Sequence, residues 1–168
     1  GPPSGNGRAA LGAAGLNGSA RYICYGADTC LDPAAYVFWL LEAGGASGVQ
    51  LLDGGYAAWA ASGGRAETEP RRLTPAVWTP APVDTLLASL GYVREHYGEA
   101  GYEIIDARSR EEWEGGGAGA SGGASDGPTS RVGHIPHSLP FDFREFTDDG
   151  ALLPAEECRE IFSMTGPR

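Results

Sequence analysis

The 168-residue sequence predicts an α/β fold in which a parallel sheet is flanked by helices on both faces. The main observation is that short apolar strands alternate with helical segments along the chain. Parallel strands need crossover connections, which usually contain a helix, so this alternation favours a parallel sheet over hairpins. The second observation is a proline-rich stretch in the middle of the chain, which divides the pattern into two parts.

The first strand and helix are predicted between residues 22 and 43. Residues 22–25 form a short β-branched and aromatic run that is typical of a buried strand. Asp32 is the expected N-cap of the helix, with Pro33 at the first helical position, where a missing N–H costs nothing. The helix should end at Gly44. It is apolar on nearly every side, so we expect it to pack between the sheet and another layer.

The same pattern then repeats on a smaller scale. Residues 49–52 predict a second buried strand, and residues 56–61 predict a short helix that ends at a pair of glycines. Residues 1–20 hold mainly Gly, Ala, Ser and Asn, which predicts a flexible arm ahead of the first strand. Residues 67–82 carry several prolines among charged side chains, and we expect a stiff polar linker and a domain boundary there.

After the linker, Asp84 is predicted to cap a helix that runs to about His96, and residues 102–106 predict a strand. Ser109 and Glu112 have the spacing of a capping box, so a short helix carrying Trp113 should begin there. A loop insertion is expected at residues 115–130 and an extended segment at residues 139–141. The last expected element is a helix at residues 154–162, with acidic residues in its first turn.

Charge and cysteine content exclude several classes of partner. The net charge of −10 disfavours nucleic acid and anionic membrane surfaces, because both require a basic face. The longest apolar run, residues 34–41, is far shorter than the ~20 residues of a membrane span. Three cysteines form neither a CxxC pair nor a cluster with histidine, so we expect no metal and no cofactor. Their odd number favours a reducing intracellular compartment, the cytoplasm or the mitochondrion.

Two stretches of the sequence resemble the rhodanese family of sulfurtransferases. The pattern Leu-Asp-Gly-Gly-aromatic-x-x-Trp at residues 52–59 resembles the closing segment of a rhodanese domain. The pattern Asp-Ala-Arg-Ser at residues 106–109, followed by Gly-His-Ile-Pro at residues 133–136, resembles the opening segment. Because the closing segment comes first, the chain is similar to a fragment of the tandem thiosulfate and 3-mercaptopyruvate sulfurtransferases. It would hold two incomplete domains: the back half of one (residues 21–66) and the front half of the next (residues 83–168).

The resemblance implies transfer of a sulfane sulfur from thiosulfate or 3-mercaptopyruvate to cyanide or a thiol, through a cysteine persulfide and without a cofactor. It also implies that the catalytic cysteine follows the helix ending near Phe162 and would lie beyond Arg168, so the chain alone should be inactive. In the first half, Gly26 stands at the position directly after the strand where the nucleophile would lie. Cys30 is the alternative nucleophile, although two neighbouring aspartates would raise its pKa. A non-catalytic rhodanese-like binding or regulatory module, or one permuted domain built from both halves, remains open.

Arg108 and Arg110 are the predicted substrate-binding residues. Arg108 should lie at the end of a parallel strand, where α/β proteins bind ligands, and its guanidinium could bind an anionic donor with two hydrogen bonds. The alternative role for Arg108 is a salt bridge to Asp106 or Glu111 that braces the loop. Arg110 could reach the same site or lie in solvent. Members of the family that the chain resembles carry a second arginine at the position of Glu112. Glutamate here departs from that pattern, and the capping box explains it.

The other candidate residues are expected to be structural. Cys24 alternates within a buried strand, and Cys158 lies in the first turn of a polar helix. His134 is expected to form a hydrogen bond with the backbone and thereby fix the loop. No carboxylate is suitably spaced to complete a metal site with His134 and His137.

Overall fold

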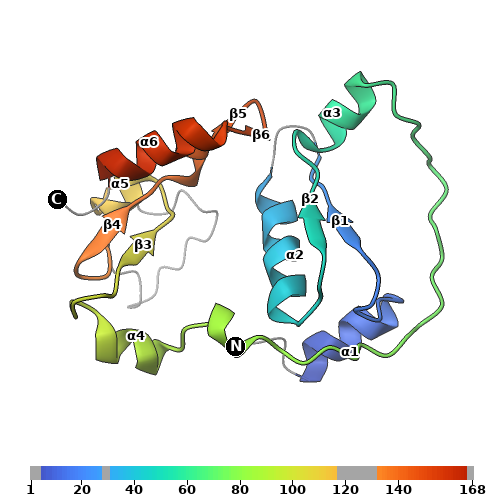
Figure 1. Cartoon of the computed structure of the whole chain (residues 1–168), viewed down its shortest axis with the longest axis horizontal. Coiled ribbons are helices and arrows are strands. Elements are labelled where there is room, and N and C mark those ends of the chain that lie inside the picture. The colour runs from blue at the N-terminus through green and yellow to red at the C-terminus, as the bar shows by residue number, and fades with distance from the viewer. Residues whose placement is uncertain (1–4, 28–30, 117–131, 166–168) are drawn as a thin grey trace. The chain divides into compact units, whose positions relative to one another are not determined.

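The computed structural model describes residues 5–27, 31–116 and 132–165. The chain divides into two compact units (Figure 1). The first unit comprises the chain up to Ser89 together with Asp149–Ala151, and the second comprises Leu90–Asp148 and the residues from Leu152 onward. The Gly/Ala/Ser tract predicted as a loop insertion lies mostly outside the described residues, as does Cys30.

The first unit contains a two-stranded parallel sheet covered by one helix. Strand β1 (Tyr22–Cys24) pairs in parallel with β2 (Val49–Leu51). Helix α2 (Asp32–Ala43) connects them and packs against both strands (Figure 1). Helix α3 (Gly55–Ala61) follows β2 after a turn in which Gly54 and Gly55 both have positive φ angles, 70° and 56°. The predicted parallel α/β arrangement is therefore present.

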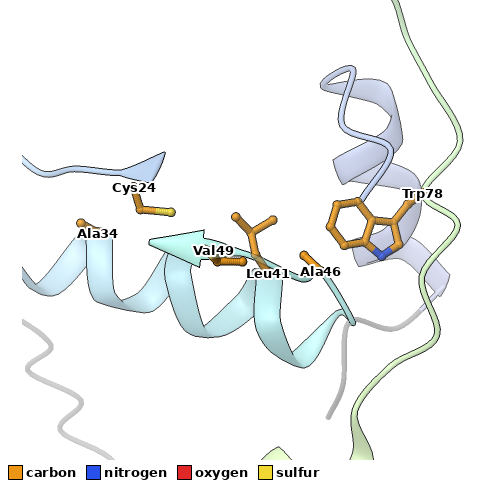
Figure 2. Close-up of a cluster of buried hydrophobic side chains, with 6 residues drawn as sticks. All are labelled: Cys24, Ala34, Leu41, Ala46, Val49 and Trp78. Atoms are coloured by element: carbon orange, nitrogen blue, oxygen red, sulfur yellow. The ribbon is translucent and has the colours of Figure 1, made fainter. Parts of the chain in front are cut away.

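The core of the first unit lies between this sheet and α2. Figure 2 shows its buried side chains, which come from β1, α2, the loop after α2, β2 and the proline-rich segment: Cys24, Ala34, Leu41, Ala46, Val49 and Trp78. Helix α2 does not lie between two layers as expected, because its residues Tyr36 and Val37 are exposed. In the described part of the chain it buries only the face that meets the sheet.

The predicted flexible arm is wrong for residues 5–20. Residues Gly5–Ala13 form helix α1, and Leu11 and Leu16 pack against the core cluster. The backbone of Gly12 lies so close to Ala76 that an added Cβ would come 2.5 Å from the Ala76 carbonyl oxygen. The amide of Ala76 donates a hydrogen bond of 2.8 Å to the Gly12 carbonyl. Two leucines and one close backbone contact thus hold a segment whose overall composition suggested disorder.

The proline-rich segment, residues 67–82, contains neither helix nor strand, and it packs on the first unit. Trp78 is only 4% exposed, and its indole Nε1 donates a hydrogen bond of 3.0 Å to the carbonyl of Gly44. The amide of Val83 donates to the carbonyl of Ala43 at 3.0 Å. The segment therefore supplies part of the core.

Two helix starts differ from the prediction. Leu31 occupies the N-cap of α2 and is buried. Asp32 lies in the first turn, where the helix dipole stabilises its negative charge. The helix expected from Asp84 to His96 is interrupted: Asp84–Leu86 form a 3₁₀ turn (η1), and helix α4 (Leu90–His96) begins only after an extended stretch. Leu86 and Leu90 are exposed, so burial contributes little to holding the turns together as one helix.

The second unit also contains a parallel strand pair. Strand β3 (Ile104–Asp106) pairs with β4 (Ser138–Pro140), with Ile104 opposite Ser138. Helix α5 (Arg110–Trp113) follows β3, and helix α6 (Ala155–Thr165) begins where the acidic first turn predicts it.

Between β4 and α6 lie a 3₁₀ turn, η2 (Phe143–Phe146), and a hairpin of β5 (Thr147–Asp148) and β6 (Ala151–Leu152). The hairpin turn is Asp149-Gly150, with φ angles of 44° and 79°, as a type I′ turn requires. Three phenylalanine rings pack together beside it, with centroids 4.8 to 5.7 Å apart: Phe141, Phe146 and Phe162. Among the described residues, no helix is both long and apolar enough to cross a bilayer.

Replacing Trp78 by Ala should destabilise the first unit by about 3–5 kcal/mol, because it removes a buried indole and its hydrogen bond. Urea unfolding monitored by circular dichroism measures this. The control is Val77→Ala, a neighbour in the same segment that is 76% exposed, which should change the stability by less than about 0.5 kcal/mol. Equal effects of the two substitutions would mean that the segment does not pack as described.

Candidate anion-binding site

The carboxyl end of β3 opens into a pocket within the second unit. The pocket has a volume of about 530 Å³. It is lined by residues of two segments, the end of β3 with its following turn and the Gly-His-Ile-Pro loop before β4: Ile105, Asp106, Ala107, Arg108, Val132, Gly133, His134, Ile135 and Ser138. Ligands of α/β proteins bind at this edge of a sheet, so the position agrees with the predicted location of the site.

Arg108 joins the two segments. Its backbone N–H and its Nε donate to Oδ1 of Asp106 at 3.1 and 2.9 Å, and its Nη2 donates to Oδ2 at 2.6 Å. The same Nη2 also donates to the carbonyl of Gly133 at 2.9 Å. The alternative of a salt bridge to Asp106 is therefore present, and it uses the guanidinium edge that could have bound an anion with two hydrogen bonds.

The ion pair keeps both partners charged. The hydrogen bond from the Arg108 side chain lowers the pKa of Asp106, although partial burial of the carboxylate opposes this. The same bond raises the pKa of Arg108. The side chain of Arg108 is 45% exposed, and its Nη1 has no hydrogen-bond partner among the described residues. Nη1 is thus the part of the guanidinium that can donate to a bound anion.

His134 is held in the pocket wall by Trp113. The two rings stack with centroids 4.0 Å apart and an interplanar angle of 11°. Nδ1 of His134 lies 2.7 Å from the carbonyl oxygen of Trp113, which only accepts hydrogen bonds, so Nδ1 carries the proton. The indole Nε1 of Trp113 in turn donates to Oγ of the buried Ser138 at 3.1 Å. The expected backbone hydrogen bond of His134 is confirmed, and it leaves Nε2 for other contacts.

The predicted capping box is confirmed at the start of α5. The amide of Glu112 donates to Oγ of Ser109 at 3.2 Å, and the amide of Ser109 donates to Oε2 of Glu112 at 3.2 Å. Glu112 is therefore explained by helix capping. Arg110 is directed to Glu114, with Nε 3.1 Å from Oε1, and it does not line the pocket. Of the two predicted arginines, the structure places only Arg108 there.

The described cysteines lack the environment of a nucleophile. Burial raises the pKa of the Cys24 thiol, which disfavours the reactive thiolate. The thiol of Cys158 donates to the carbonyl of Leu153 at 3.5 Å. Cys30, the alternative nucleophile, lies outside the described residues. Within the described ranges, no three histidine, cysteine or acidic side chains cluster as metal ligands would.

One pair was missed from the sequence. Asp142 accepts hydrogen bonds from the backbone and side chain of Arg144, at 3.1 Å to the amide and 2.8 Å to Nε, and this pairing lowers its pKa. The Asp-x-Arg spacing, shared with Asp106 and Arg108, was the available signal. The second pair caps η2 and does not line the pocket.

Comparison with known proteins agrees with the fold and the motifs, although no family model matches the chain. A probable 3-mercaptopyruvate sulfurtransferase of Pseudomonas aeruginosa is 33% identical over 133 residues, which are 77% of this chain and 44% of that protein. The 3-mercaptopyruvate sulfurtransferase of Rattus norvegicus is 29% identical, and the thiosulfate sulfurtransferase of Bos taurus is 27% identical, each over 90% of this chain and 50% of the relative. The chain thus spans about half the length of the curated relatives it matches.

Solved structures show the same relationship. SseA from Escherichia coli, described as a 3-mercaptopyruvate sulfotransferase with the rhodanese fold, matches with a TM-score of 0.77 and 25% identity. The match covers 95% of this chain and 57% of SseA. EanB in complex with ergothioneine matches in fold, with a TM-score of 0.76 at 19% identity over 94% of this chain and 41% of EanB. The chain is a rhodanese-fold α/β protein. Within that fold it belongs to the family of the 3-mercaptopyruvate and thiosulfate sulfurtransferases.

The Asp106–Arg108 pair predicts a defined pH dependence of stability. Because the pKa of Asp106 is lower in the folded chain, the pair stabilises the fold above the ordinary aspartate pKa of ~3.9. This contribution is lost as the pH falls through that value and then through the lower folded pKa. The gap in unfolding free energy between the wild type and Asp106→Asn should therefore be largest near neutral pH and shrink in acid. Urea unfolding at several pH values measures the gap, and a constant gap would contradict the assignment.

Proposed function

We propose that this chain supplies an anion-binding site to a sulfurtransferase. The enzyme would move a sulfane sulfur from thiosulfate or 3-mercaptopyruvate to a thiophilic acceptor, cyanide or a thiol, through a cysteine persulfide. The observation that carries this is the pocket at the end of β3, where the other hydrogen bonds of the Arg108 guanidinium leave its Nη1 for a ligand. Both proposed donors are small anions. The relatives include enzymes named for each of them.

The proposed chemistry needs a thiolate that attacks the outer sulfur of the donor. The donor then leaves without that sulfur, as sulfite or pyruvate, and the cysteine persulfide passes it to the acceptor. Cys24 is unsuited to this role because its thiol is buried and its pKa is raised. We therefore propose that the nucleophile is neither Cys24 nor Cys158. Partners are small molecules in a reducing compartment, the cytoplasm or the mitochondrion, and the net charge of −10 disfavours nucleic acid and anionic membranes.

The second candidate is a non-catalytic binding module with the same pocket. It is favoured by one observation: Asp106 and Gly133 already engage Nε and Nη2 of Arg108. Such a pocket could hold an anion without assembling a reaction site around it. The two functions differ in turnover and share anion binding, so they require separate measurements.

The chain purified alone should form no thiocyanate from thiosulfate and cyanide above the uncatalysed rate. The physical reason is that burial raises the pKa of the Cys24 thiol, and that the Cys158 thiol donates a hydrogen bond to the Leu153 carbonyl. Thiocyanate is measured as its coloured iron complex. Turnover that Cys30→Ser abolishes would identify Cys30 as the nucleophile and overturn the inactivity prediction. Turnover that survives this change would mean that Cys24 or Cys158 is the nucleophile.

Arg108→Lys should weaken thiosulfate binding about ten- to hundredfold while keeping most of the stability. A lysine ammonium can still pair with Asp106, but it lacks the planar fork that serves Asp106, Gly133 and a ligand together. One charge-assisted hydrogen bond is worth ~1.5–3 kcal/mol, which gives this range. Arg108→Ala should lose both binding and stability, because it also leaves the carboxylate of Asp106 without its partner. Calorimetric titration and thermal unfolding measure the two quantities.

The matched control is Arg144→Ala. It removes the corresponding ion pair with Asp142 outside the pocket, so it should lower stability and leave thiosulfate affinity unchanged. Unchanged affinity in Arg108→Lys and Arg108→Ala would mean that Arg108 only braces the loop. Loss of affinity in Arg144→Ala would show that the measurement follows stability instead of the pocket.

A further inference from the structure

Three backbone amides that follow β3 are engaged by side chains of the chain itself. The amide of Arg108 donates to Asp106 Oδ1 at 3.1 Å, and the amide of Ser109 donates to Glu112 Oε2 at 3.2 Å. The amide of Glu112 donates to Ser109 Oγ at 3.2 Å. Free amides where a helix begins are a common source of donors to anions in α/β proteins. These three amides are not available to a ligand, whereas Nη1 of Arg108 is.

The capping box holds the carboxylate of Glu112 close to Arg108. Oε2 of Glu112 accepts from the amide of Ser109 and also from its hydroxyl, the latter at 2.9 Å, and the side chain is half-buried. Ser109 directly follows Arg108, so the carboxylate cannot turn away from the end of β3 without breaking both bonds. Its hydrogen-bond donors here are neutral groups, so its negative charge is not cancelled, and partial burial reduces the screening of that charge.

Two carboxylates therefore act on one guanidinium. The hydrogen bond to Asp106 is the main cause of the raised pKa of Arg108, and the charge of Glu112 raises it further. Asp106 pairs directly with Arg108 and neutralises it, so Glu112 gives this group of three side chains a surplus negative charge. His134 adds a positive charge beside them only when its ring is protonated.

The charge of a ligand decides how strongly this surplus opposes its binding. Thiosulfate carries two negative charges. 3-Mercaptopyruvate carries one, on its carboxylate, while its thiol is neutral. Because the Coulomb energy is proportional to the charge of the ligand, Glu112 repels a dianion about twice as strongly as a monoanion at the same place.

We propose that Glu112 makes the Arg108 pocket selective for sulfur donors with a single negative charge, such as 3-mercaptopyruvate, over the dianion thiosulfate. This inference rests on the proposed anion-binding function of the pocket and narrows it to one class of donor, a carboxylate that bears a neutral thiol. Glu112 does not line the pocket, so it acts through its charge and not by contact. Thiosulfate remains a ligand, but it is the weaker one.

The test compares two anions of similar shape and different charge, thiosulfate and methanethiosulfonate. Methanethiosulfonate has the same terminal sulfur and a methyl group in place of one oxygen, so it carries one charge. Each anion, and 3-mercaptopyruvate, is titrated by NMR into the full chain, and the dissociation constants are read from the signals of Arg108 and Gly133. The wild type should bind both monoanions more tightly than thiosulfate.

Glu112→Gln is the decisive substitution, because glutamine can still accept the hydrogen bond of the Ser109 amide in a capping box. The substitution removes the charge and keeps the shape. At a solvent-exposed site, one nearby unit charge changes affinity roughly threefold per unit of ligand charge. In Glu112→Gln the affinity for a monoanion should therefore rise about threefold and that for thiosulfate about tenfold.

The matched control is Glu114→Gln, which removes the same charge from the same short helix. Glu114 is exposed, pairs with Arg110 and lies outside the pocket. Any effect of the total charge of the chain would appear equally in both variants. Glu114→Gln should therefore leave the ratio of the thiosulfate and methanethiosulfonate dissociation constants unchanged. Thermal unfolding checks that both variants keep the fold.

The outcomes separate this inference from the function on which it rests. If neither anion gives saturable shifts at Arg108, the anion-binding site itself is wrong, and the selectivity falls with it. If both anions bind but Glu112→Gln leaves their affinity ratio unchanged, the site stands and the role of Glu112 is overturned. A wild type that prefers thiosulfate, or a ratio that Glu114→Gln shifts as much as Glu112→Gln does, would also overturn it.

Discussion

The candidate site depends on one interaction, the hydrogen-bonded ion pair of Arg108 with Asp106 and its link to the carbonyl of Gly133. It ties the end of β3 to the loop that carries His134, two segments separated by many residues. The hydrogen bonds from the Arg108 side chain lower the pKa of Asp106 and keep it ionised, and the direction of the guanidinium leaves Nη1 for a ligand in the pocket. An arginine without an acidic partner would offer a stronger positive charge, but its guanidinium would have no fixed orientation. The paired arginine offers one oriented donor, which suits a small anion.

The first unit is subject to a second constraint, the incomplete covering of a small parallel sheet. There α2 and Trp78 supply one layer of core, and Ile23 and Tyr25 on the opposite side of the sheet are exposed. Among the described residues no large side chain is fully buried. The curated relatives are about twice as long as this chain.

Much of the fold could be predicted because its signals are local. The strand around Ile23, the capping box of Ser109 and the acidic start of α6 each depend on a few neighbouring residues, and all three were found in the structure. The packing of α1 and of Trp78 could not be predicted, because these segments are held by contacts between distant parts of the chain. The Asp-Gly turn of the β5–β6 hairpin was a local signal that was overlooked.

The site shows the same division. The Asp-Ala-Arg-Ser motif predicted Arg108 as a substrate-binding residue, and the Gly-His-Ile-Pro motif predicted that His134 fixes its loop; both line the pocket. Their orientation depends on Gly133 and on the stacking of Trp113, which spacing alone does not reveal. Arg110 has the same residue type and a nearby position, but the turn of α5 directs it to Glu114. Sequence motifs located the pocket, and tertiary contacts decided which arginine faces it.

The most direct test of the account is to titrate thiosulfate into the ¹⁵N-labelled chain and follow the backbone amides and arginine Nε–H signals by NMR. The account predicts saturable shifts at Arg108, Gly133 and His134, with the Arg108 Nε–H signal retained because its bond to Asp106 persists. Shifts confined to residues outside the pocket, or no saturable shift at the pocket, would contradict the claim that the end of β3 is an anion-binding site.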